Sequence, residues 1–207
     1  MNIAFWNIRG LVDLVRQSEV RHFVRENKIC CLGLLETKVS PHLFDSISSS
    51  LCSGWKWIGN YEHSVRGRIW VEWNPVLVDF NSCYVSSQAI HGTLKVLHTG
   101  LTLYLMTVYG EHTFVARRPL WSDIIRLSST LSDDPWLVAS DFNAIRDSLD
   151  HLGSPETWLS SFDEFSECIC QAELDDLQYV EMRFTWSTSL GPHRKQRKID
   201  RVLVNSK

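Results

Sequence analysis

Short stretches of continuous apolar sequence limit the fold of this chain more than any other feature. Ile29 to Leu35, Leu101 to Tyr109 and Trp136 to Ala139 are mostly apolar. Runs of this length without polar alternation are typical of strands buried on both faces. A sheet covered on both faces needs packed layers on either side of it. The sequence therefore predicts an α/β fold with layers around sheets rather than a β-sandwich or a helical bundle.

Helix and turn signals alternate with these strands. Helices are predicted at Val12 to Asn27, from Ser40-Pro41 onward, at Arg117 to Leu131 and at Leu159 to Ala172. Further strands are predicted at Asn2 to Trp6, Phe184 to Ser187 and Ile199 to Val204. Between Trp55 and Tyr109, successive short strands are separated by expected turns at Gly59-Asn60, Gly67, Asn74-Pro75, Gly92 and Gly100.

Size and composition indicate one ordinary globular domain over residues 1–207. A chain of 207 residues buries roughly 70% of its unfolded surface. The net charge of −3 disfavours non-specific binding of a polyanion, but it allows acidic residues gathered around a metal ion. No apolar run is long enough to span a membrane, and no secretory signal is visible. The six cysteines follow no zinc-binding spacing, so buried, reduced thiols and a nuclear or cytoplasmic location are expected.

Polar side chains stand at the ends of the predicted strands. They are Asn7, Glu36, Tyr109, Asp141 and Asn143, with Asp200 near the start of the last strand. Strand ends on one rim converge on a common cleft in α/β folds. Oxygen ligands suit a hard cation, so Mg²⁺ or Mn²⁺ is the predicted cofactor, and zinc is not.

Six motifs in order resemble those of the endonuclease/exonuclease/phosphatase superfamily. They are Phe5 to Gly10, Leu35 to Lys38, Val108 to Gly110, Ser140 to Asn143, Phe184 to Ser187 and Lys198 to Leu203. Together with the basic residues from Arg194 to Lys198, they look most like the apurinic-type endonuclease domain of plant non-LTR (LINE-type) retrotransposons. The resemblance implies a four-layer α/β sandwich of deoxyribonuclease I type, with two packed mixed sheets flanked by helices.

The resemblance also implies a role for each site residue. Glu36 is similar to the principal Mg²⁺ ligand, with Asn7 and Asp200 close to the metal. Asp141 is similar to the carboxylate that orients or deprotonates the attacking water, and Asn143 to the amide that holds the water and the phosphate. Tyr109 and Asn7 complete the implied catalytic set, Tyr109 as the phenol near the scissile phosphate. Nucleic-acid contacts are expected from Arg194, Lys195, Arg197, Lys198, Thr185 and Trp186.

Two departures from the family pattern matter. Arg9 stands where relatives often carry an acidic or amide side chain, which argues against a second metal there. The family's closing Ser-Asp-His motif and its strand are absent before Lys207. The expectation is therefore a domain that is incomplete at its C-terminus, with its last strand missing and with weak or no activity.

Each residue alone also fits a structural role. Asn7 fits a turn, Glu36 a solvated charge, and Asp141 with Asn143 a helix cap. The ordered set instead favours DNA nicking by a monomer. The nick is expected to prime reverse transcription by a reverse transcriptase domain of the parent polyprotein. The alternatives are an inactive remnant and a phosphatase of the same superfamily.

Overall fold

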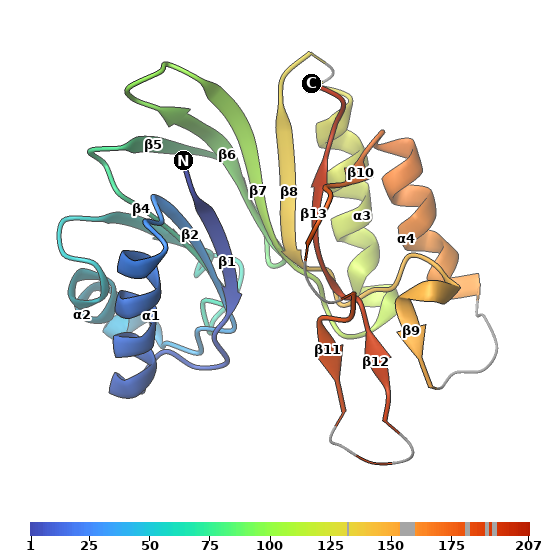
Figure 1. The fold of residues 1–207 in the computed structure, drawn as a ribbon, viewed down its shortest axis with the longest axis horizontal. Coiled ribbons are helices and arrows are strands. Elements are labelled where there is room, and N and C mark those ends of the chain that lie inside the picture. The colour runs from blue at the N-terminus through green and yellow to red at the C-terminus, as the bar shows by residue number, and fades with distance from the viewer. Residues whose placement is uncertain (132, 154–159, 181–182, 189–190, 192–193) are drawn as a thin grey trace. The chain divides into compact units, whose positions relative to one another are not determined.

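The computed structural model describes residues 1–131, 133–153, 160–180, 183–188, 191 and 194–207 (Figure 1). The chain forms two compact units, Met1–Tyr109 (unit 1) and Gly110–Lys207 (unit 2). The single domain over residues 1–207 stays a prediction. Within the described residues, no helix combines the length and the apolar character that crossing a membrane requires.

Unit 1 contains two helices and seven strands. Its elements are β1 (Ile3–Asn7), α1 (Leu14–Glu26), β2 (Cys31–Leu35), α2 (Pro41–Leu51), β3 (Lys56–Gly59), β4 (Ile69–Trp73), β5 (Val78–Val85), β6 (Ala89–Val96) and β7 (Thr102–Tyr109). One sheet has the order β1-β2-β4-β3, in which β1 and β2 are parallel and the other pairs antiparallel. Strands β5, β6 and β7 pair antiparallel in sequence order.

The β1-β2-β4-β3 sheet is covered on both faces, as its apolar runs predict. On one face, Trp70 of β4 packs against Phe44 of α2 with ring centroids 4.7 Å apart. On the other face, a Cβ added to Gly33 of β2 would lie 2.9 Å from Thr107 of β7. That close approach explains why glycine interrupts the apolar run.

Unit 2 packs two helices against antiparallel strands. Its elements are α3 (Phe114–Ser128), β8 (Trp136–Asp141), the 3-10 helix η1 (Ser148–Asp150), β9 (His151–Leu152), α4 (Ser160–Gln171), β10 (Asp175–Asp176), β11 (Trp186–Ser187), β12 (Gln196–Arg197) and β13 (Asp200–Val204). β13 pairs with both β8 and β10, and β12 with both β11 and β9. Phe165 of α4 stacks on Trp121 of α3 at 4.8 Å and contacts Phe142, which follows β8, at 5.1 Å.

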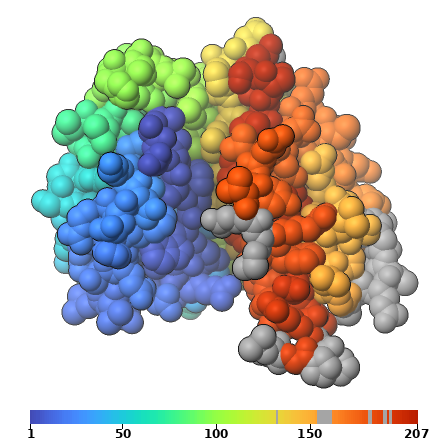
Figure 2. Space-filling view, in the orientation of Figure 1, coloured from blue at the N-terminus to red at the C-terminus, as the bar shows by residue number. Residues whose placement is uncertain are grey.

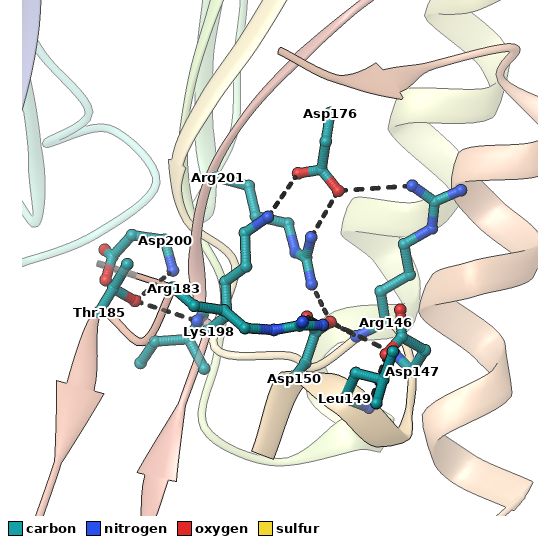
Figure 3. Close-up of polar contacts among 11 residues, drawn as sticks. Arg146, Asp147, Leu149, Asp150, Asp176, Arg183, Thr185, Lys198, Asp200 and Arg201 are labelled. Atoms are coloured by element: carbon teal, nitrogen blue, oxygen red, sulfur yellow. Dashed lines mark hydrogen bonds and ion pairs between the residues drawn. The ribbon is translucent and has the colours of Figure 1, made fainter. Parts of the chain in front are cut away.

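An ionic network joins β10, β13 and η1 inside unit 2 (Figure 3). Asp176 of β10 accepts hydrogen bonds from Arg201 at 2.6 Å and from Lys198 at 3.3 Å. Arg201 also donates to Asp150 of η1, and both of these side chains are almost fully buried. Burial raises the pKa of Asp176, but Arg201 and Lys198 outweigh it and hold the pKa below its usual range.

Several element predictions were wrong in detail. Gly92 is not a turn: it lies inside β6, where a Cβ would come within 2.3 Å of the Asn81 carbonyl oxygen. Helix α3 begins at Phe114 rather than Arg117, because the Thr113 hydroxyl caps it by accepting the Ala116 N–H. Leu159, the predicted start of α4, lies outside the described residues.

The cysteines are free, as expected, but not all are buried. Cys30, Cys31, Cys52 and Cys168 are buried, whereas Cys83 and Cys170 are exposed. The exposed pair corrects the prediction that all six thiols are buried. Cys168 is buried and Cys170 exposed, so these two thiols lie on different faces of α4.

Candidate active-site residues of each unit

In unit 1, parallel pairing brings Asn7 and Glu36 together. Asn7 is the last residue of β1 and is the Cα partner of Leu35, the last residue of β2. Glu36 follows directly, and the Asn7 side-chain amide donates a hydrogen bond of 2.9 Å to Glu36 Oε1. Two residues that are far apart in sequence thus form one polar pair at the end of the sheet.

Glu36 is held as a carboxylate by its surroundings. Burial raises its pKa, but the hydrogen bond from Asn7 and the cations Lys38 and Arg9 outweigh burial, so the pKa lies below its usual value. The Lys38 ammonium lies 3.4 Å from Glu36 Oε2. Glu36 has φ 50°, a left-handed backbone conformation that non-glycine residues rarely adopt, which is common at functional positions.

Tyr109 ends β7 in the same unit. Only 3% of the residue is exposed, and its backbone N–H donates to the Gln88 carbonyl oxygen at 2.9 Å. The guanidinium of Arg68, the residue before β4, lies 5.9 Å from the centroid of the Tyr109 ring.

In unit 2, antiparallel pairing aligns Asp141 with Asp200. They are Cα partners on β8 and β13, so their side chains leave the same face of the sheet. Strand β8 includes Asp141 because β13 pairs with it. The sequence analysis instead predicted that the strand ends at Ala139, before Asp141.

Asn143 is fixed by two hydrogen bonds within unit 2. Its backbone N–H donates to Asp141 Oδ1 at 2.9 Å, and its side-chain amide donates to the Gly110 carbonyl oxygen at 2.7 Å. The Gly110 N–H in turn donates to the Asp141 carbonyl oxygen at 2.8 Å. Only glycine fits at 110, because a Cβ there would lie 2.3 Å from the Phe142 carbonyl oxygen.

Thr185 and Trp186 take supporting positions. The Thr185 hydroxyl accepts from the backbone N–H groups of Ile199 at 3.1 Å and Asp200 at 3.0 Å. Thr185 therefore sets the start of β13 and, with it, the place of Asp200. Trp186 of β11 lies under the Arg197 guanidinium, which is 5.7 Å from the ring centroid.

The predicted nucleic-acid-binding cations fall into two groups. Arg194, Lys195 and Arg197 belong to the β11–β12 segment, which protrudes from the rest of unit 2 (Figures 1 and 2). Lys198 is different: it is 7% exposed, pairs with Asp176, and lies 4.3 Å from the centroid of the Tyr179 ring. Its contacts give Lys198 a structural role inside the unit.

A pocket of about 360 Å³ lies beside Asn143 in unit 2. Its walls combine cationic and polar groups with aromatic and aliphatic ones. The residues that line it are His112, Thr113, Phe114, Arg117, Trp121, Asn143, Ala144, Ile145, Phe162, Phe165, Arg197 and Ile199.

The oxygen ligands of unit 1 fit a weakly held Mg²⁺. Proteins bind this ion through one or two carboxylates together with waters and substrate phosphates. Glu36 supplies an ionised carboxylate at the end of β2, beside the Asn7 amide. Among the described residues, no three His, Cys, Asp or Glu side chains cluster so as to hold a metal ion.

Comparison with solved structures shows the class of fold. The chain has the four-layer α/β fold of endonuclease/exonuclease/phosphatase proteins, which confirms the fold class and the resemblance at the level of the fold. It is similar to the endonuclease domain of TRAS1, a telomere-specific non-LTR retrotransposon (TM-score 0.69, 14% identity, covering 98% of this chain and 84% of that chain). No protein-family model matches the sequence, and a search of curated proteins found no match.

Two further similar structures carry different activities on this fold. One is D. rerio TDP2 complexed with single-strand DNA product (TM-score 0.68, 16% identity, 99% of this chain and 83% of that chain). The other is a Bacteroides thetaiotaomicron mannosyl-6-phosphatase (TM-score 0.63, 13% identity, 99% of this chain and 85% of that chain). The fold alone therefore leaves the substrate open.

Sequence reasoning missed Arg68 in unit 1, and His112 and Arg117 in unit 2, as residues near candidate site residues of their own unit. Arg68 approaches Tyr109, and His112 and Arg117 line the pocket beside Asn143. The sequence analysis identified Arg117 only as the first residue of a predicted helix. Arg68 and His112 stand next to strand and turn signals, but no sequence pattern singles them out.

Proposed function

We propose that the chain is a Mg²⁺-dependent phosphodiesterase that nicks DNA, as the endonuclease domain of a plant non-LTR retrotransposon. The observation that carries the proposal is the fixed arrangement of Asp141, Asn143 and Gly110, with Asp200 directly opposite Asp141. A carboxylate and an amide held this firmly suit a reaction that must orient a water molecule. The similarity to the TRAS1 endonuclease domain supports the choice of DNA.

The roles follow from the chemistry of each group. Asp141 orients the attacking water and accepts its proton, while the Asn143 amide holds the phosphate. General-base help of this kind contributes roughly 10²–10⁴ in rate. Tyr109 supplies a phenol near the phosphate. Glu36 beside Asn7 would hold Mg²⁺, which would supply a Lewis acid for the phosphoryl oxygens.

DNA contacts come from unit 2 in this proposal. The pocket beside Asn143 has the size of a small-molecule site and offers aromatic surface next to cations, which suits a nucleoside attached to a phosphate. Arg194, Lys195 and Arg197 contact backbone phosphates. The nick primes reverse transcription by a domain of the parent polyprotein.

The test is nicking of supercoiled plasmid with Mg²⁺ or Mn²⁺, read by conversion to open circles. Asp141→Asn should lower the rate by roughly 10²-fold or more, in line with loss of a general base. Asp79→Asn changes an exposed aspartate of β5 and should leave the rate unchanged. Glu36→Gln should also weaken Mn²⁺ binding measured by calorimetry.

Three results would contradict the proposal in different ways. Hydrolysis of phosphomonoesters without nicking would favour the phosphatase alternative. Mn²⁺ and DNA binding without turnover would favour the inactive remnant. Nicking that survives Asp141→Asn would remove Asp141 from the mechanism.

A further inference from the structure

Arg117 is a buried arginine of α3 whose hydrogen bonds go to backbone carbonyl groups. Only 8% of the residue is exposed. Its Nη1 donates to the carbonyl oxygen of Glu111 at 2.8 Å and to that of His112 at 3.1 Å. One guanidinium therefore holds two consecutive peptide groups of the segment between β7 and α3.

The same side chain limits the space around Gly110. A Cβ added to Gly110 would lie 3.3 Å from Arg117 Cδ and 2.3 Å from the Phe142 carbonyl oxygen. Gly110 thus packs against both the aliphatic part of Arg117 and the backbone that follows β8. Arg117 bears on all three residues of the 110–112 segment, by packing on the first and by hydrogen bonds to the other two.

The 110–112 segment also sets the Asn143 side chain. The Asn143 amide donates to the Gly110 carbonyl oxygen at 2.7 Å, and the Gly110 N–H donates to the Asp141 carbonyl oxygen at 2.8 Å. The place of the Asn143 amide therefore depends on where the Gly110 carbonyl group points. His112 and Asn143 line the same pocket, so a shift of the segment would move the pocket wall as well.

The chemistry of Arg117 suits a role in positioning better than a role in stability alone. Its Nε group is buried and has no hydrogen-bond partner among the described residues, and both of its hydrogen bonds go to neutral carbonyl groups. Burying a charge in this way is costly, and an apolar side chain of similar volume in its place is often neutral or stabilising. A rigid donor group is needed where two carbonyl groups must be held in one orientation.

We propose that Arg117 is a positioning residue for the phosphodiesterase reaction: through the 110–112 segment, it fixes the Asn143 amide that holds the phosphate. The inference rests on the proposed function, because that function assigns the phosphate contact to Asn143. In this role Arg117 itself touches no reacting atom.

The experiment compares initial rates of plasmid nicking with Mg²⁺ for Arg117→Met and wild type. We expect the rate to fall by roughly 10²-fold, the cost of misplacing a reacting group by about 1 Å. Arg117→Lys should recover part of the lost rate, because an ammonium can donate to a carbonyl group without the fork of the guanidinium. Arg118→Met serves as the matched control and should nick like wild type, because Arg118 is the next residue of α3, is exposed, and pairs with Glu164.

A double-mutant cycle tests whether Arg117 acts through Asn143. In an Asn143→Ala background, Arg117→Met should cause little further loss of rate, because the two residues act in series. Losses that multiply would show that Arg117 acts independently and would refute the positioning role. Thermal unfolding of Arg117→Met should be close to that of wild type, and a large drop in melting temperature would show a structural role instead.

The outcomes separate this inference from the proposed function. If wild-type protein nicks nothing, the endonuclease proposal fails and the positioning role fails with it. If wild type nicks and Arg117→Met nicks equally fast, only the role of Arg117 is refuted. Hydrogen exchange at residues 110–116 needs no turnover: it should be faster in Arg117→Met than in wild type and unchanged in Arg118→Met. Unchanged exchange in Arg117→Met would refute the hold on the segment, even if the rate falls.

Discussion

Replacing Glu72 should remove a strong pH dependence of stability. Glu72 lies on β4 in unit 1, with Leu32 and Trp57 as Cα partners on either side. The residue is completely buried, and among the described residues neither of its carboxylate oxygens has a hydrogen-bond partner. Burial raises the pKa of Glu72 from 4.5 to about 8, because the charged form would lose its hydration.

The sign and size of the effect follow from linkage. Since the pKa is raised in the folded chain, the unfolded chain ionises first, and stability falls as pH rises from about 4.5 towards 8. One pKa unit corresponds to about 1.4 kcal/mol, so between pH 5 and pH 7 the loss is on the order of 2–3 kcal/mol. Burial raises the pKa of nearby Cys52 to about 12, so this thiol does not titrate in the same range.

Urea denaturation between pH 5 and pH 8, followed by tryptophan fluorescence, measures this loss. Glu72→Gln and Glu72→Met should both flatten the fall in stability relative to wild type. Glu62→Gln alters an exposed glutamate of unit 1 and serves as the matched control. A Glu72→Gln variant that keeps the wild-type pH dependence would refute the reasoning, whatever its absolute stability.

Two further predictions concern unit 2. Arg201→Met should cost roughly 3–5 kcal/mol in urea denaturation because it leaves the Asp150 carboxylate buried without its main cation. Arg126→Ala, which breaks an exposed ion pair, should cost at most about 1 kcal/mol, and equal losses would contradict the assigned role of the network. Neutralising Arg194, Lys195 and Arg197 together should lower the salt slope of duplex binding by about 0.9 per lost contact without changing stability. An unaltered slope would leave these residues as solvated surface.

The sequence predicted strand ends well because burial on both faces leaves a clear signature. The apolar run before Glu36 and the one before Asp141 both correspond to observed strands, β2 and β8. The pairing of Asn7 with Glu36 follows from β1 and β2 lying parallel. Boundaries were less predictable where a side chain decides them, as Thr113 does for α3.

The residues that sequence reasoning missed share one physical property: their positions depend on strand register rather than on their own neighbours. Arg68 approaches Tyr109 because β4 pairs with β2 and packs near β7, and neither pairing is visible in the residues around Arg68. Side-chain contacts also set Lys198 apart from the basic segment with which sequence reasoning grouped it. The residues just before β13 carry Lys198 toward Asp176 of β10, so its charge is used within the unit. The basic run therefore divides by its contacts: Arg194, Lys195 and Arg197 of the protruding β11–β12 segment stay predicted DNA contacts, while Lys198, between β12 and β13, pairs with Asp176 inside the unit.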